Sequence, residues 1–258
     1  MRARILSARE MPARLLDLAQ PPARLYLVGE LPRGPTVGIV GTRHPTEGAR
    51  AFARDLARQL AAAGIVVLSG GALGVDTAVH EGALDVGGST VVVAPSAYDR
   101  PYPEQNAELF ASIVRAGGGH LSRERPGTLA AHPKFFQRNS VLAALAHVLV
   151  LVEAPYRSGA RNAVKRAREL GRPVFVVPSV PWNQRGIGGL LELQRGARLL
   201  LGPGDVLAEL RRQQLHPVAL PEAAASASGP QLPLQLGALR NDDDELNATA
   251  RDARADPG

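Results

Sequence analysis

Three turns in this sequence place glycine beside a hydroxyl group or a cation, shortly after an apolar run. Glycine lets a backbone approach a ligand closely, and hydroxyl groups and the first N–H groups of a helix donate hydrogen bonds to phosphate oxygens. Because an ordinary strand-to-helix connection uses the same residue types, both interpretations hold for any single turn. The candidate residues are Gly41, Thr42 and Arg43; Ser69, Gly70, Gly71 and Gly74; and Ser158 and Gly159.

A further segment, residues 132–139, sets cations beside aromatic rings. Lys134 and Arg138 flank Phe135 and Phe136 in what we predict to be a loop leading into an apolar helix, although only 4% of the chain is aromatic. Unpaired bases stack on exposed aromatic rings while neighbouring cations hold the nucleic-acid backbone. The alternative is that the two phenylalanines pack against the start of the helix, as hydrophobic staples do.

The sequence lacks the patterns of a catalytic or metal centre. It has no cysteine, which excludes thiol catalysis, and its six histidines are not paired at metal-ligand spacing. Asp76 and His80 share one face of a predicted helix, and without a nearby nucleophile we interpret them as structural partners rather than as a general base. The chain also has neither a P-loop nor a G-x-G-x-x-G motif. We therefore expect no enzyme activity, no cofactor and no metal.

The elements that position these turns follow from the apolar pattern. Runs of Val, Ile and Leu without polar alternation are typical of strands buried on both faces of a parallel sheet. Residues 46–63 predict an amphipathic helix with Leu56 and Leu60 on its apolar stripe. The expected fold class is α/β, an extended Rossmann-like, doubly wound, mostly parallel sheet with helices on both faces, whose strand ends bring the three turns to one edge. The predicted strands are residues 36–40, 65–69, 89–94, 147–154, 173–178 and 197–202.

Composition divides the chain into three parts. Residues 1–35 are predicted to be an entry segment with a possible edge strand at RLYLVGELP, residues 36–216 the Rossmann-like domain, and residues 217–258 a disordered tail that is rich in Pro and Ala and then acidic. No apolar run reaches the length of about 18 residues that a membrane span needs, and the N-terminus has no apolar signal core. We therefore expect a cytoplasmic protein without a membrane partner.

The charge is basic outside the predicted tail. The chain has 30 Lys and Arg against 24 Asp and Glu, and residues 221–258 hold seven of the acidic residues and only three basic ones. Since Lys134 and Lys165 are the two lysines, nearly all of this charge is guanidinium. Guanidinium groups bind phosphates and stack on bases, while a solvated arginine surface is the ordinary alternative.

The order and spacing of these motifs resemble the DNA-processing protein A family, also called Smf, over residues 22–202. The segments that carry the resemblance are "LYLVGELP", "VGIVGTR", "VVLSGGALGVDTAVHEGAL" and "FFQRNSVLAALAHVLVLVEAPYRSGARNAVKRARELGRPVFVVP". The resemblance implies an extended Rossmann fold, binding of single-stranded DNA and a homodimer. It also implies a recombination mediator that protects incoming DNA and assists loading of the RecA recombinase during natural transformation.

The resemblance also assigns site residues and leaves two other functions open. Family members usually carry a basic residue where Leu73 and Ser140 stand. The alternatives are a nucleotide-binding sensor of the same superfamily and a nucleotide phosphoribohydrolase, whose motif "GIGGLLE" (186–192) matches only superficially. The positions that match the family's DNA pocket are Arg43, Ser69, Gly70, Ala72, Gly74, Asp76, Phe135, Arg138, Asn139, Ser158 and Gly159.

Overall fold

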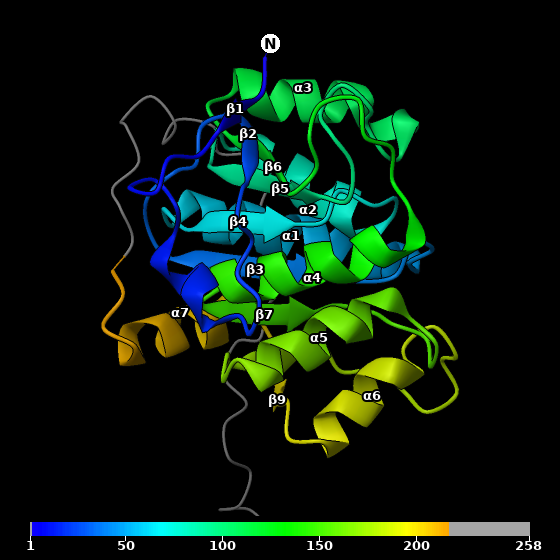
Figure 1. The fold of residues 1–258 in the computed structure, drawn as a ribbon. Helices are drawn as coiled ribbons and strands as arrows, with labels where there is room; N and C mark the ends of the chain where they lie inside the picture. Colours follow the sequence, from blue (N-terminus) through cyan, green and yellow to red (C-terminus); the bar gives the residue numbers. More distant parts are fainter. Residues whose placement is uncertain (1, 217–258) are drawn as a thin grey trace, which may run out of the picture. The chain divides into compact units, whose positions relative to one another are not determined.

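Nine strands form one sheet within residues 2–216, the part of the chain that the computed structural model describes (Figure 1). They are β1 (Arg4–Ile5), β2 (Tyr26–Gly29), β3 (Thr36–Val40), β4 (Val66–Ser69), β5 (Thr90–Ala94), β6 (Gly119–Ser122), β7 (Val148–Leu151), β8 (Val174–Val176) and β9 (Arg198–Leu199). Their order is β1-β2-β6-β5-β4-β3-β7-β8-β9. Every pair from β6 to β9 is parallel, whereas β2 pairs antiparallel with β6 and β1 with β2. The predicted fold class is confirmed.

Helices cover both faces of the sheet. They are α1 (Glu47–Ala62), α2 (Val75–Leu84), α3 (Ala107–Arg115), α4 (His132–Leu145), α5 (Gly159–Glu169), α6 (Ile187–Gln194) and α7 (Pro203–Arg212), with 3-10 turns η1 (Ala13–Asp17) and η2 (Glu104–Asn106). In Figure 1, α4 and α5 lie in front of the sheet, and α1 and α2 lie behind it. The predicted helix 46–63 is α1, which Thr46 caps by accepting from the backbone N–H of Ala49. The predicted tail lies outside the described residues.

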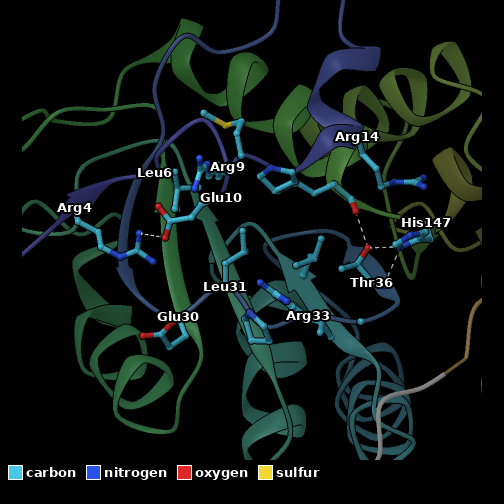
Figure 2. A pocket seen from close by; sticks show the side chains of 17 residues that line it. Arg4, Leu6, Arg9, Glu10, Arg14, Glu30, Leu31, Arg33, Thr36 and His147 are labelled. Carbon is cyan, nitrogen blue, oxygen red and sulfur yellow. Dashed lines mark hydrogen bonds and ion pairs between the residues drawn. The ribbon is translucent and has the colours of Figure 1, made fainter.

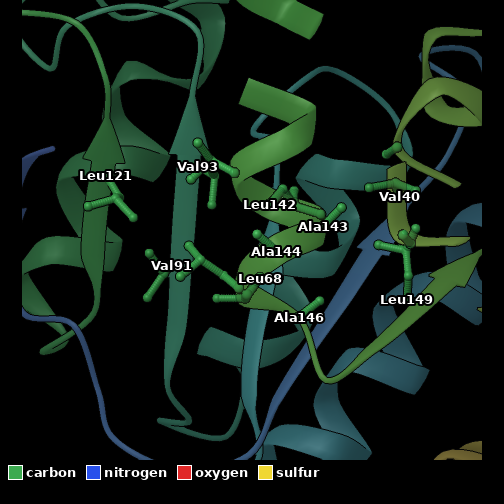
Figure 3. Packing of buried hydrophobic residues seen from close by; sticks show 14 of the residues in the cluster. Val40, Leu68, Val91, Val93, Leu121, Leu142, Ala143, Ala144, Ala146 and Leu149 are labelled. Atoms are coloured by element: carbon green, nitrogen blue, oxygen red, sulfur yellow. The ribbon is translucent and has the colours of Figure 1, made fainter. Parts of the chain in front are cut away.

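The alternation of side chains along each strand builds a separate core on each face. Leu68 and Val91 point to the α4 face, where they belong to the same buried cluster as Leu142 of α4 (Figure 3). The neighbouring strand residues Val67 and Val150 point the other way and pack with α1, α2 and α7. Burial on both faces is the reason why the strands read as unbroken apolar runs.

Two strands depart from the sequence expectation. The predicted edge strand at RLYLVGELP is β2, but β1 covers it, so β2 lies inside the sheet. β6 was not predicted, because Gly119 and His120 give it little intrinsic strand propensity. It forms between β5 and β2, where its backbone groups pair on both sides.

Two histidines are buried in the core in their neutral form. His80 lies against Thr90, with 2.8 Å between its Nδ1 and the hydroxyl oxygen, so the expected pairing with Asp76 is wrong. Burial lowers the pKa of His80 from 6.5 to about 3, and burial lowers the pKa of His120 to about 4. The unfolded chain therefore takes up protons in a pH range where the folded chain does not.

We expect the free energy of unfolding to fall as the pH drops from 6.5 towards 4, because the lowered pKa of each histidine favours the protonated unfolded state. The loss for His120 reaches about 3 kcal/mol once the pH has fallen to about 4 or below, where the folded residue is protonated as well. Urea unfolding at a series of pH values measures it. His120→Phe fits beside Tyr98 and Phe110, removes one titrating group and should flatten the curve; an unchanged slope in this variant would contradict the assignment.

Candidate nucleic-acid interface

The predicted turns meet where the winding of the sheet reverses direction. β3 pairs with β4 on one side and with β7 on the other, so the chain moves outward from β3 in both directions. In sheets of this class, ligands bind at the carboxyl ends of the strands at such a point. A cavity of about 710 Å³ opens there, which we call the switch-point cavity. The predicted residues that line it are Gly41, Thr42, Arg43, Ala72, Asp76, Phe135, Arg138, Asn139, Ser158 and Gly159.

Arg43 and an aromatic pair form one wall of the switch-point cavity. The Arg43 guanidinium lies over the ring of Phe135, 5.6 Å from its centroid. Tyr102 meets the same ring edge-on, with 5.4 Å between the two centroids. Arg43 is exposed, and within residues 2–216 it forms no ion pair. The wall therefore offers an uncompensated cation next to flat rings.

A buried ion pair lies deeper in the cavity. The Nη1 atom of Arg138 is 3.9 Å from Oδ2 of Asp76, and the two side chains are 9% and 6% exposed. Burial raises the pKa of Asp76, an effect that Arg138 opposes, and burial lowers the pKa of Arg138, an effect that Asp76 opposes. Because 3.9 Å is longer than a hydrogen bond, the two groups form an ion pair without a hydrogen bond between them.

Glycine at two positions makes this arrangement possible. A Cβ atom on Gly70 would lie 1.2 Å from Nη1 of Arg138, so only glycine leaves room for the guanidinium. Gly74 has a φ of +84°, and a Cβ there would lie 2.6 Å from the carbonyl oxygens of Thr42 and Arg43. Gly74 thus lets the start of α2 approach the Arg43 turn. Both glycines support the cavity without lining it.

Two further residues of the second turn lie beneath the cavity. Ser69 is fully buried, and its hydroxyl donates to the carbonyl of Ile39 at 2.7 Å, so the expectation that it donates to a phosphate is wrong. Gly71 lies in the core against Phe110. A serine that ends a buried strand satisfies its hydroxyl inside the sheet, because an unpaired buried hydroxyl is costly.

The aromatic and basic segment lies on the first turns of α4 and not in a loop. α4 begins at His132 with Pro133 in its first turn, a common helix start that the sequence interpretation passed over. Lys134 turns away from the switch-point cavity: its Nζ donates to the carbonyl of Leu129 at 2.7 Å and lies 3.1 Å from a Glu124 carboxylate oxygen. Lys134 therefore does not line the cavity, whereas Arg138 does.

The third turn supplies a helix N-terminus. Ser158 caps α5 by accepting from the backbone N–H of Ala160 at 3.2 Å. Asn139 of α4 donates to the carbonyl of Gly159, which fixes this N-terminus beside α4. The helix dipole and the free N–H groups at such an end favour an anion.

Glu153, which the sequence interpretation did not select as a site residue, joins the loops around the cavity. It follows β7, is only 5% exposed, and accepts from the backbone N–H of Thr46 at 2.8 Å and from the side-chain amide of Asn183 at 3.1 Å. Its carbonyl accepts from the N–H of Thr42. One residue thus connects the loops after β3, β7 and β8. A carboxylate that ends an otherwise apolar strand run was the signal for it.

We expect Glu153→Ala to destabilise the protein by about 1–3 kcal/mol, because buried donors lose their acceptor. Urea unfolding followed by circular dichroism measures the change. Glu47→Ala, at an exposed carboxylate in the first turn of α1, is the matched control. Equal unfolding midpoints for the two variants would contradict the connecting role of Glu153.

The charge of the switch-point cavity is positive. Among residues 2–216, three guanidinium groups and a single carboxylate line it, from Arg43, Arg138, Arg157 and Asp76. Its aromatic rings are Tyr102, Phe135 and Phe136, the last of which meets His132 edge-on. The cavity therefore combines features for holding phosphate and for stacking a base.

A second cavity of about 550 Å³ lies at the opposite end of the strands, next to the starts of β3 and β4 (Figure 2). Its lining includes Thr36 and His147, whose side chains are 2.7 Å apart, and Arg4, which pairs with Glu10. None of the predicted site residues lines it. The candidate chemistry is thus confined to the carboxyl edge of the sheet.

A comparison with models of known protein families identifies the family of this chain. The family model for DNA recombination-mediator protein A matches residues 3–211. The chain belongs to this family. The resemblance that the motifs indicate is thereby confirmed, over nearly all of the described residues.

Relatives of this family come from several bacteria. The chain is 35% identical over 207 residues to protein Smf of Synechocystis, covering 78% of this chain and 52% of that protein. It is 40% identical over 186 residues to a putative DNA processing protein DprA of Mycobacterium tuberculosis, covering 72% and 46%. The chain thus spans about half the length of these curated relatives.

Solved structures of the family share the fold. The structure of DNA processing protein A from Streptococcus pneumoniae has a TM-score of 0.74 and 31% identity, covering 81% of this chain and 75% of that one. The protein from Helicobacter pylori, whose structure concerns its single-stranded DNA binding mode, has a TM-score of 0.74 and 30% identity, covering 83% and 97%.

At two positions the resemblance implies a basic residue, and this chain carries Leu73 and Ser140 there. Leu73 is 38% exposed and lines a shallow hollow together with Tyr102. The Ser140 hydroxyl donates to the carbonyl of Phe136 within α4. In this member the positive charge of the site therefore comes from Arg43, Arg138 and Arg157.

Within residues 2–216, no helix has the length and hydropathy of a membrane span.

Proposed function

We propose that this protein binds single-stranded DNA in the switch-point cavity, without catalysing a reaction on it. The observation that carries the proposal is the Arg43 guanidinium held over the Phe135 ring. An unpaired nucleotide presents a phosphate and a flat base at the same time, and this wall meets both groups. Stacking on an aromatic ring needs no particular base, which suits binding without sequence preference.

The wider role that fits this binding is recombination mediation. A protein that covers single-stranded DNA along a basic surface protects it and can present it to a recombinase such as RecA. Membership of the recombination-mediator family supports this role, together with a cytoplasmic location, a homodimer and the handling of incoming DNA in natural transformation. The DNA-binding mode reported for the Helicobacter pylori relative supports the choice of ligand.

A titration of labelled oligothymidylate over a salt series tests the proposal. Because each phosphate contact releases counterions, the logarithm of the affinity should fall linearly with the logarithm of the salt concentration. Thymidine monophosphate as competitor should displace the oligonucleotide only weakly. Salt-independent binding, or a mononucleotide that binds more tightly than the oligonucleotide, would overturn the proposal.

The second candidate, a sensor of a small nucleotide, is favoured by the size of the cavity. A volume of about 710 Å³ is within the range of small-molecule pockets, so a mononucleotide fits. Competition between thymidine monophosphate and the labelled oligonucleotide separates this candidate from DNA binding. The phosphoribohydrolase alternative gains no support from "GIGGLLE". That segment forms the start of α6, where Gly188 packs against the carbonyls of Ala154 and Pro155.

A further inference from the structure

Two aromatic side chains on the loops after β7 and β8 are unusually exposed. Trp182 is 79% exposed, more than any other large hydrophobic residue among residues 2–216, and Tyr156 is 62% exposed. Aromatic rings of this size dominate binding surfaces, and folding alone gains little from leaving them in water. Neither residue has a role in the cavity described above.

One of the two loops lines the cavity, and the other is bonded to it. Tyr156 stands between Pro155 and Arg157, which line the cavity at the end of β7. Trp182 lies on the loop after β8, which the bond from Asn183 to Glu153 fastens to the β7 loop. The start of α6 strengthens this attachment, since the Gly188 N–H donates to the carbonyl of Ala154 at 2.8 Å.

Side chains of α5 and α6 hold the Tyr156 loop in place. The guanidinium of Arg161, on α5, lies 5.6 Å from the centroid of the Tyr156 ring and donates to the Tyr156 carbonyl. Arg161 is fixed in turn by the buried carboxylate of Glu192, 2.8 Å away on α6. α5 and α6 lie side by side in Figure 1. The ring is thus presented to solvent on a supported backbone.

The charge around the two rings matches a polyanion. Arg157 and Arg185 are both exposed and stand next to Tyr156 and near Trp182 in the chain. Within residues 2–216 neither of them forms an ion pair. An alternation of free cations and flat rings is the surface that extended single-stranded nucleic acid occupies, because backbone and bases are met in turn.

We propose that single-stranded DNA continues from the switch-point cavity over the loops after β7 and β8, with its bases stacked on Tyr156 and Trp182 and its phosphates held by Arg157 and Arg185. This inference rests on the proposed function and adds a second contact region to it. The cavity holds the first nucleotides, and the two loops, which we call the aromatic extension, hold those that follow. Short oligonucleotides fill the cavity alone, and longer ones reach the aromatic extension as well.

The test uses Trp182 as its own reporter, because it is the only tryptophan of the chain. Oligothymidylates of about 5 and about 20 nucleotides bracket the usual site sizes of single-strand binding modules. Each is added to the whole protein while binding is followed by the anisotropy of a label on the DNA. A base stacked on the indole quenches its fluorescence, so we expect strong quenching with the longer oligonucleotide and little with the shorter one.

Variants complete the test. Trp182→Ala should weaken binding of the longer oligonucleotide about tenfold and leave the shorter one within about twofold, since stacking on one ring contributes at about this level. Trp182→Phe should retain much of the affinity. Leu16→Ala, at another strongly exposed apolar residue, is the control and should change neither.

The outcomes separate the two proposals. If the longer oligonucleotide binds by anisotropy while Trp182 fluorescence stays constant and Trp182→Ala binds like the wild type, the aromatic extension is overturned and the proposed function stands. If neither oligonucleotide binds, the proposed function fails, and the aromatic extension fails with it. A fluorescence change that follows protein concentration without DNA assigns the surface to a contact between copies and overturns the extension.

Discussion

Replacing Arg43 with alanine is expected to weaken binding of single-stranded DNA by about 2 kcal/mol, or roughly 30-fold. The Arg43 side chain is exposed and forms no ion pair within residues 2–216, so its charge is available to a phosphate. It also backs the Phe135 ring, so its removal loosens the stacking surface. Fluorescence anisotropy with labelled oligothymidylate at fixed salt measures the change.

Two further variants give this prediction its specificity. Arg43→Lys keeps the charge but loses the planar guanidinium over the ring, so it should recover only part of the affinity. Arg50→Ala removes another exposed arginine, which lies on α1 outside the cavity and 3.9 Å from Glu81, and should bind DNA almost like the wild type. If Arg43→Ala and Arg50→Ala lose the same affinity, the effect is one of overall charge and the site is misplaced.

Replacing Arg138 with methionine is expected to destabilise the protein by about 3 kcal/mol near neutral pH, because it leaves the buried Asp76 carboxylate without its partner. Methionine keeps most of the aliphatic volume, so the change isolates the charge. Burial already raises the pKa of Asp76, and Arg138 is the main group that opposes this rise. Urea unfolding monitored by circular dichroism gives the free-energy difference from the wild type.

The pH dependence of that difference follows from the raised pKa of Asp76. In Arg138→Met the folded protein takes up a proton on Asp76 at a pH where the unfolded chain, with an ordinary aspartate pKa of 3.8, does not. Proton uptake by the folded state is stabilising as the pH falls, so the difference should be larger at about pH 8 than at about pH 5.

The double variant Asp76→Asn with Arg138→Met is the control for this mechanism. With both charges gone it should lose less stability than Arg138→Met alone, and its difference from the wild type should not shrink at low pH through Asp76. A single variant as stable as the wild type would show that the pair contributes nothing to the fold.

The sequence was sufficient to place the turns but not to orient their side chains. Unbroken apolar runs predicted parallel strands, and parallel strands put Arg43 and Ser158 at one edge. Whether a side chain at that edge faces the ligand depends on its backbone direction. Ser69 points back into the sheet to bond Ile39, and Lys134 reaches outward to Glu124. Neither contact has a signature in local sequence, since each partner lies 10 or more residues away.

Long-range pairing also explains why one strand of the sheet and one residue of the site were not predicted. β6 forms because its backbone pairs with β5 on one side and with β2 on the other. This pairing outweighs the low intrinsic strand propensity of its residues. Glu153 acts through Thr46 and Asn183, which are separated from it by 107 and 30 residues. Contacts of this kind are determined by the packed fold, so they cannot be predicted from residues that are neighbours in the sequence.

The cations of the switch-point cavity are arginines throughout, and no lysine lines it within the described part of the chain. Enzymes that acylate lysine therefore have no target there, and alkaline conditions below the pKa of guanidinium do not discharge it. A cell that needs this protein to release its ligand must act by other means, such as arginine methylation, a competing polyanion or a partner that takes the strand away. The positive charge of the cavity therefore stays constant, and release of the ligand depends on the modification, competitor or partner that acts on it.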